Sequence, residues 1–189
     1  MLSPLTARER IAIARILKVN HAGEYGAIRI YAGQRLIARY FHKELLPFLD
    51  EVFRHEMEHC QIFVAAMPAR DSRPCRMMWA WGFGGYILGI ATALMGYQAI
   101  MVCTAAVEGT VHMHLNDQIR FLASKDEPLR MLISDIRKQE LEHLHYAETR
   151  LVPNGLYRPL EWLIRLSTQA VIWLSTQGDV SRMRRDIAD

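Results

Sequence analysis

The stretch FRHEMEHCQIF, residues 53–63, decides how this sequence folds. It places Glu56 and His59 one helical turn apart, and Glu56 falls on a stripe of apolar residues with helical spacing. The same Glu-x-x-His pattern returns at Glu140 and His143, again on an apolar stripe. The sequence therefore predicts two amphipathic helices that each carry a glutamate and a histidine on the face turned to the interior.

Two more glutamates lie on apolar stripes of other predicted helices. Glu24 and Glu108 stand at the same distance before the two Glu-x-x-His motifs, because 56 minus 24 and 140 minus 108 both equal 32. The two halves of the chain therefore repeat at an offset of 84 in residue number (140 minus 56). Tandem helix pairs of this kind bring two glutamates and two Glu-x-x-His sets together around one pseudo-twofold axis.

Such a cluster needs a counter-charge. Burying four ionised carboxylates costs several kcal/mol for each unpaired charge, and their repulsion would force most of them to protonate. Two divalent cations cancel the charge of minus four. Oxygen and imidazole donors without thiolate suit iron or manganese better than a structural zinc, and iron is favoured because two-electron chemistry with dioxygen needs a redox-active pair. A single Glu-x-x-His usually marks a solvated helix face, but its repetition at matched spacing favours the dimetal interpretation.

Apolar residues recur with helical spacing along nearly the whole chain, and no stretch shows the sustained alternation of a strand. Pro, Gly and capping residues divide the pattern into helices. We expect helices over about 6–40, 44–67, 126–151 and 158–175, and another that follows a Gly/Trp-rich stretch and ends near 123. This predicts an all-α single domain over 1–189: a four-helix bundle with a long apolar crossover (core 6–151), one or two additional C-terminal helices and a polar tail over 176–189.

Composition narrows the function classes. The 189 residues carry 23 Lys and Arg against 20 Asp and Glu, a formal net charge of +3. This balance is too even for a surface that follows phosphates, so nucleic acid is not an expected partner. The three cysteines form no Cys-x-x-Cys pair, which favours a reducing compartment without disulfides. The stretch 1–20 has the pattern of an ordinary helix rather than of a removable leader.

The segment 77–107 carries no charged side chain and is long enough for a membrane span. Its glycines dilute the hydrophobicity, and it leads directly into Glu108, so a surface contact is favoured over a span. We expect residues 79–94 to dip into one leaflet, with Gly84 and Gly85 breaking the chain before the next helix. Arginines flanking this segment and in the tail are expected to contact anionic phosphates: Arg73, Arg76, Arg182, Arg184 and Arg185.

Four further side chains are candidates for a role near the site. His21 is expected to orient a neighbouring glutamate or fill a core position rather than bind metal. His112 and His114 are ambiguous, since either could face the site or be a helix histidine with satisfied polar atoms. Cys60 is more often a small core residue than a metal ligand.

Five motifs together resemble the demethoxyubiquinone hydroxylase family of ubiquinone biosynthesis over about 18–175: NHAGEYGA (20–27), EMEH (56–59), CTAAVE (103–108), NDQIR (116–120) and ELEH (140–143). The first motif is specific to that family, whereas paired Glu-x-x-His alone indicates the wider ferritin-like di-iron class. The resemblance implies a ferritin-like fold and two iron ions per chain. It implies as iron ligands Glu24, Glu56, His59, Glu108, Glu140 and His143, with His114 matching a histidine beside the site.

The resemblance also implies an activity and a location. The family's members are monooxygenases that use O2 to hydroxylate the ring of a demethoxy-polyprenyl-benzoquinol, with NADH or the quinol itself as reductant. They attach peripherally to the inner membrane, on the cytoplasmic face in a bacterium or the matrix face in a mitochondrion. The resemblance is also compatible with a lipid-binding partner protein and with a homo-oligomer. Two positions depart from the family pattern, because Gly109 and Leu115 stand where an acidic residue and a tyrosine are common, which weakens the case for a tyrosyl role in electron or proton delivery.

Other function classes stay open at this point. Ferritin-like ferroxidases, rubrerythrins and manganese catalases handle iron or peroxide with the same bundle and much of the ligand pattern. A storage cage favours a polar exterior, however, and the crossover here is apolar. A quinone or lipid carrier without catalysis would not need six ligands at matched spacing.

Overall fold

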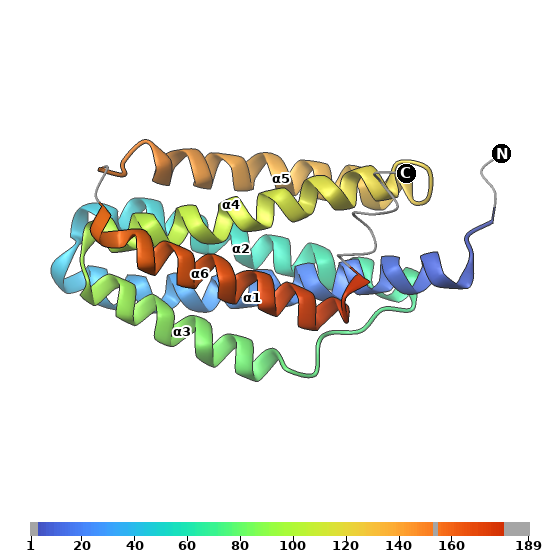
Figure 1. The fold of residues 1–189 in the computed structure, drawn as a ribbon, viewed down its shortest axis with the longest axis horizontal. Helices are drawn as coiled ribbons and strands as arrows, with labels where there is room; N and C mark the ends of the chain where they lie inside the picture. The colour runs from blue at the N-terminus through green and yellow to red at the C-terminus, as the bar shows by residue number, and fades with distance from the viewer. Residues whose placement is uncertain (1–3, 153–154, 180–189) are drawn as a thin grey trace.

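The computed structural model describes residues 4–152 and 155–179, and every regular element within them is helical. The expected all-α bundle is confirmed. The elements are α1 (Ala7–Phe41), η1 (Lys43–Leu45), α2 (Leu46–Ala66), η2 (Pro68–Arg70), α3 (Met78–Leu94), α4 (Tyr97–Leu122), α5 (Glu127–Glu148), η3 (Gly155–Tyr157) and α6 (Arg158–Thr176). Figure 1 shows the α-helices lying roughly along the long axis, with α3 and α5 at opposite edges of the view.

Local signals set the helix ends. Thr6 and Glu9 form a reciprocal capping box at the start of α1, in which the Glu9 carboxylate accepts from the Thr6 N–H at 2.8 Å. Asp126 caps α5 by accepting from the Leu129 N–H at 3.0 Å, and a proline occupies the first turn. The bounds expected for the helices over 6–40, 44–67, 126–151 and 158–175 all agree closely with those observed.

The third helix is where the expectation was wrong. Residues 78–94 form the continuous helix α3, and the chain breaks at Gly96 rather than at Gly84 and Gly85. Gly96 has φ +105°, a conformation open to glycine and strained for other residues. α3 therefore passes into α4 at Gly96, whereas the glycines of the sequence predicted the break earlier in the chain, at Gly84 and Gly85.

Glycines inside α3 allow close packing instead of breaking the helix. A Cβ on Gly89 would overlap the carbonyl oxygen of Ile30, and one on Gly85 would lie 2.6 Å from the carbonyl oxygen of Gly26. On the facing helix, a Cβ on Gly33 would lie 2.6 Å from the Tyr86 carbonyl oxygen. The backbones of α1 and α3 thus touch along their length, and the packing offsets the roughly 1 kcal/mol that each glycine costs a helix.

Two apolar clusters make up most of the core formed by the described residues. One contains Leu49 and Met101, and the other contains Leu17 and Ile133, all fully or almost fully buried. The Glu and His positions lie between the two clusters along α1, α2, α4 and α5. α6 packs against α4 and α1, as α3 packs against α1. Among the described helices, none combines the length and the hydropathy that crossing a bilayer requires.

Candidate metal centre

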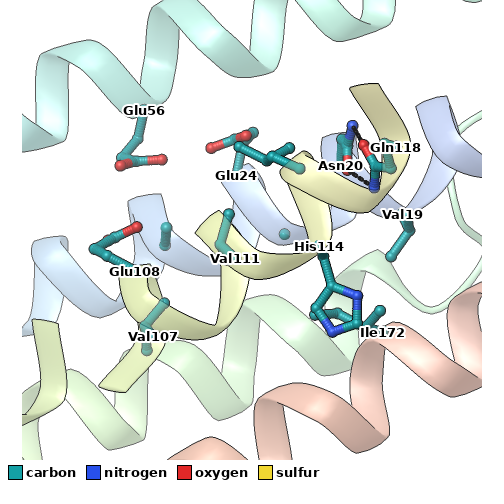
Figure 2. Close-up of a pocket in the computed structure, with 13 residues that line it drawn as sticks. Val19, Asn20, Glu24, Glu56, Val107, Glu108, Val111, His114, Gln118 and Ile172 are labelled. Atoms are coloured by element: carbon teal, nitrogen blue, oxygen red, sulfur yellow. Dashed lines mark hydrogen bonds between the residues drawn. The ribbon is translucent and has the colours of Figure 1, made fainter. Parts of the chain in front are cut away.

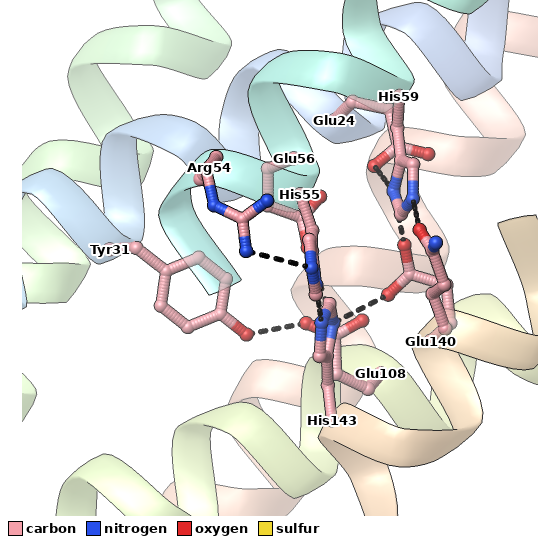
Figure 3. A network of polar contacts seen from close by, with 10 residues as sticks. Glu24, Tyr31, Arg54, His55, Glu56, His59, Glu108, Glu140 and His143 are labelled. Carbon is pink, nitrogen blue, oxygen red and sulfur yellow. Dashed lines mark hydrogen bonds and ion pairs between the residues drawn. The ribbon is translucent and has the colours of Figure 1, made fainter. Parts of the chain in front are cut away.

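Six buried acidic and imidazole side chains meet in the middle of the bundle (Figure 3). α1 and α4 contribute one glutamate each, and α2 and α5 contribute a glutamate and a histidine each. The six are Glu24, Glu56, His59, Glu108, Glu140 and His143, and each is at most 5% exposed. The structure therefore brings together every residue that the sequence proposed as a ligand.

The cluster divides into two groups that could each hold one metal ion. The ligand atoms of the first group, Glu24, Glu56, His59 and Glu140, all lie within 4.8 Å of one another. The second group consists of Glu56, Glu108, Glu140 and His143 and meets the same limit. Glu56 and Glu140 belong to both groups, so these two carboxylates could each serve both ions.

The imidazoles turn the same atom toward the carboxylates. Nδ1 of His59 lies 2.8 Å from Oε1 of Glu140, and Nδ1 of His143 lies 3.3 Å from the other oxygen of Glu140. The atoms of the first contact, between His59 and Glu140, are not oriented for a hydrogen bond. Nδ1 of His59 and Oε1 of Glu140, like Oε1 of Glu56, are buried without a hydrogen-bond partner in the described chain. Buried polar atoms without a partner are costly, and a cation bound by these atoms would remove that cost. The residues present therefore fit a metal centre.

The comparisons with known proteins agree with this geometry. Residues 11–175 match the family model described as ubiquinone biosynthesis protein COQ7. The chain belongs to this family. It is 38% identical over 175 residues to the NADPH-dependent 3-demethoxyubiquinone 3-hydroxylase of Dictyostelium discoideum, covering 89% of this chain and 79% of that protein. The mouse protein of the same name is 39% identical, covering 88% and 78%. The 3-demethoxyubiquinol 3-hydroxylase of Rhodospirillum rubrum is 34% identical over 166 residues, covering 86% and 77%.

Burial and mutual repulsion set the charges of this COQ7-family cluster. Burial raises the pKa of both Glu56 and Glu108 well above the ordinary value, and the nearby Glu140 carboxylate raises it further. Burial also opposes ionisation of Glu140, but His143 and His59 hold its pKa below the ordinary value. Against the effect of burial, the carboxylates of Glu140 and Glu24 raise the pKa of His59 to about 11. These shifts favour protonation of groups that a metal ion would need in deprotonated form.

Tyr31 is a residue that the sequence did not place in the site. Its hydroxyl donates a 2.5 Å hydrogen bond to Oε1 of Glu108, and the side chain is 2% exposed. Burial and the neighbouring Glu108 raise the pKa of Tyr31 well above its ordinary value, so the phenol stays a neutral donor. The sequence places Tyr31 on the apolar stripe of its helix but does not indicate its partner, because Glu108 lies 77 residues further along the chain, on α4.

A cavity of about 40 Å³ reaches the carboxylates from the side of α1, α4 and α6. Figure 2 shows Glu56 and Glu108 at one side of it and Asn20 and Gln118 at another. The amides of Asn20 and Gln118 exchange two hydrogen bonds, of 2.8 and 3.0 Å. The remaining lining is mostly apolar and consists of Val19, Gly23, Glu24, Ala27, Val107, Val111, His114, Leu115 and Ile172. A narrow, mostly apolar passage therefore leads to the acidic cluster.

The other candidate residues divide between the cavity and the core. His114 is buried in the cavity wall, whereas His112 is half-buried and does not line it. Leu115, where the family often has tyrosine, is 1% exposed and forms apolar wall. Cys60 and His21 belong to neither ligand group. Burial raises the pKa of the Cys60 thiol to about 11, which disfavours the thiolate that metal binding needs.

Proposed function

We propose that this protein is a demethoxyubiquinone hydroxylase, a di-iron monooxygenase that hydroxylates the ring of a demethoxy-polyprenyl-benzoquinol. The observation that carries the proposal is the pair of ligand groups sharing Glu56 and Glu140 at the inner end of an apolar-walled cavity. Family membership and the relatives' names support the same reaction. We propose iron over manganese because ring hydroxylation by dioxygen needs a readily oxidised metal pair, and the donor set accepts either ion.

The reaction inserts one oxygen atom of O2 into a ring C–H bond and releases the other as water, consuming two electrons and two protons. The six Glu and His side chains would hold the two iron ions, which would supply the electrons that dioxygen takes up, and an external reductant would have to replace those electrons. Two relatives are named as NADPH-dependent, so NADPH is the first reductant to test, ahead of the NADH or quinol that the resemblance suggested. O2 is the co-substrate.

The chain's own residues hold and shield the reacting centre. Glu56 and Glu140 would serve both metal ions, and Glu24 and Glu108 would serve one ion each. Tyr31 orients the Glu108 carboxylate through its hydrogen bond. The mostly apolar cavity wall faces the carboxylates, with His114 as a polar neighbour, and at about 40 Å³ the cavity must widen before the ring of the quinol can reach them.

The substrate's polyprenyl tail calls for an apolar approach, and two helices provide one. α3 exposes Trp79 at 71% and Phe83 at 68%, and Ile87 follows one turn later on the same face. α6 exposes its own apolar side chains: Trp162, Leu163, Leu166, Trp173 and Leu174. We propose that these faces rest on a lipid surface, the inner membrane, so that the quinol enters the cavity from the bilayer.

The arginines expected to assist this contact are only partly described. Arg73 and Arg76 precede α3 and are exposed, whereas Arg182, Arg184 and Arg185 lie outside the described residues. The lipid-binding partner protein and the homo-oligomer remain predictions, as does the assignment of one domain to the whole chain.

Quinone profiling tests the proposed function. Cells lacking this protein should accumulate a demethoxy precursor and lose ubiquinone, and the wild-type gene should restore it. Glu56→Ala and Glu140→Ala should not restore it, while Cys60→Ser should, since a hard-ligand site has no use for that thiol. Normal quinone content in the cells lacking the protein, with iron oxidation retained by the purified protein, would instead favour the ferroxidase alternative.

A further inference from the structure

Each of the two histidines in the cluster has a polar contact with a residue outside the ligand set. That residue lies on the facing helix, directly before its ligand glutamate. Nε2 of His59 on α2 donates a 2.7 Å hydrogen bond to Oε1 of Gln139 on α5. Nε2 of His143 on α5 lies 3.0 Å from Nδ1 of His55 on α2 (Figure 3). Gln139 and His55 immediately precede Glu140 and Glu56, and their numbers differ by 84 (139 minus 55), the offset of the internal repeat. The outer contacts therefore follow the same pseudo-twofold relation as the ligands.

These contacts decide which imidazole nitrogen is free to bind a metal. A neutral imidazole carries one N–H, so a proton held on Nε2 leaves a lone pair on Nδ1. Nδ1 is the atom that faces the carboxylates in both His59 and His143. An amide oxygen can only accept, so Gln139 selects this tautomer of His59. His55 does the same for His143 when its own Nδ1 accepts.

We propose that Gln139 and His55 are positioning residues for the two metal ions, one residue for each ion. Gln139 acts through His59 on the group that contains Glu24, and His55 acts through His143 on the group that contains Glu108. The inference rests on the proposed di-metal function. It adds two residues that lie outside the ligand set, one exposed and one half-buried.

The two positioning residues are not equivalent, because His55 has a second polar neighbour. Nη2 of Arg54 lies 3.4 Å from Nε2 of His55, and a guanidinium can only donate. When Nδ1 of His55 accepts from His143, the proton of His55 resides on Nε2, and Arg54 must turn away. Oε1 of Glu58, 3.4 Å from the other terminal nitrogen of Arg54, offers it an alternative partner. The Gln139 oxygen can only accept from Nε2 of His59, whereas Nδ1 of His55 can either accept from His143 or donate to it.

Metal titration tests the proposal without relying on turnover. The full-length protein, stripped of metal, is titrated with Co²⁺ under anaerobic conditions, and visible absorption reports each binding step. His55→Ala and Gln139→Ala should each weaken one of two binding steps by about 10- to 100-fold and leave the other unchanged. Glu108→Gln and Glu24→Gln, each confined to one group, identify the steps: His55→Ala should reproduce the spectrum of Glu108→Gln, and Gln139→Ala that of Glu24→Gln.

Conservative variants separate positioning from packing. His55→Gln keeps an acceptor and copies the other half of the repeat, so it should restore the weakened step. His55→Phe and Gln139→Leu keep bulk but lose the acceptor, and they should behave like the alanine variants. Met57→Ala and Lys138→Ala, exposed on the same two helices, are the matched controls and should bind like the wild type.

The outcomes distinguish a failure of the positioning proposal from a failure of the di-metal function. If the wild type binds two Co²⁺ ions and the His55 and Gln139 variants match it, or weaken both steps equally, the positioning proposal is overturned. A wild type that binds no Co²⁺ overturns the di-metal function itself. Circular dichroism of each variant confirms that the helices are retained before any titration is interpreted.

Discussion

The hydroxyl of Tyr31 on α1 donates a 2.5 Å hydrogen bond to Oε1 of Glu108 on α4, across the middle of the bundle. A hydrogen bond to a charged group contributes about 1.5–3 kcal/mol, so Tyr31→Phe should raise the dissociation constant of one metal ion by about tenfold or more. The effect should fall on the ion that Glu108 serves. Tyr40→Phe, a change at an exposed tyrosine of the same helix, is the control. Unchanged metal binding in Tyr31→Phe would show that Glu108 holds its position without the phenol.

The two shared carboxylates should matter more than the two that serve one group each. Glu56→Ala or Glu140→Ala removes a ligand from both groups, and we expect iron content to fall from about two per chain and turnover to be abolished. Iron analysis and a quinol hydroxylation assay measure the two effects. Cys60→Ser should keep both at the wild-type level. Retention of iron and activity in both glutamate variants would refute the ligand assignment.

Metal binding should release protons. Burial and repulsion raise the pKa of Glu56 and Glu108, so these carboxyls keep their protons to higher pH than free carboxyls do. Contacts with Glu140 and Glu24 raise the pKa of His59 to about 11, so this imidazole holds its proton at neutral pH. A metal ligand must be deprotonated, so affinity should weaken steadily as pH falls. Calorimetric titration with Fe²⁺ in two buffers of different ionisation enthalpy measures the number released. Binding heats that are identical in both buffers would contradict this charge assignment.

Away from the metal centre, Asp126 should make stability depend on acid pH. Burial opposes ionisation of this carboxyl, but hydrogen bonds from Arg70, at 2.6 and 2.9 Å, and from the Leu129 N–H hold its pKa below the ordinary value. A lowered pKa stabilises the fold above the unfolded-state value of about 3.9, and this contribution is lost as pH falls through the folded-state value.

Asp126→Asn should therefore lower the free energy of unfolding at pH 7 by about 1–2 kcal/mol, and the difference should shrink toward pH 3. Urea unfolding at a series of pH values measures it. Asp135→Asn, at an exposed residue that pairs with Lys138 within α5, should change stability little at any pH. A constant difference between wild type and Asp126→Asn at all pH values would exclude the ion pair as its cause.

The exposed face of α3 should bind lipid. Trp79→Glu combined with Phe83→Glu places two charges on that face, and flotation with vesicles containing anionic lipid should show reduced association. Binding of the wild type should also weaken with salt if Arg73 and Arg76 contact phosphates. The control is Met131→Glu with Leu141→Glu, an equal change at exposed apolar residues of α5. Equal flotation of both double variants would place the contact elsewhere.

Helical periodicity carries most of what was predictable here. The ligand positions follow from apolar stripes and the spacing of Glu-x-x-His, because both are local properties of a helix. The break was predicted at Gly84 and Gly85 instead of Gly96 because each glycine destabilises a helix by about 1 kcal/mol relative to alanine. That cost does not reveal whether another backbone packs against the glycine, and Gly85 and Gly89 lie where α1 approaches most closely. Such contacts depend on how two helices meet, which spacing within one helix does not determine.

The contacts around the ligands were missed for a similar reason. Gln139 is exposed on α5, and its partner His59 lies far away in the sequence, on α2. Nothing in the residues around either one indicates that pairing. Only the repeat offset could have suggested it, since the residue before each motif glutamate occupies an equivalent place in the two halves.

That offset also relates α3 to α6, because positions 78–94 shifted by 84 become 162–178 and α6 covers Arg158–Thr176. Each half of the chain is a long helix, a Glu-x-x-His helix and a shorter helix with exposed apolar residues. Each ligand group takes one carboxylate from the other half: Glu140 completes the group of the first half, and Glu56 completes that of the second. Neither half could therefore hold a metal ion with all four ligands by itself, and a bound pair of ions would link the two halves across the pseudo-twofold axis.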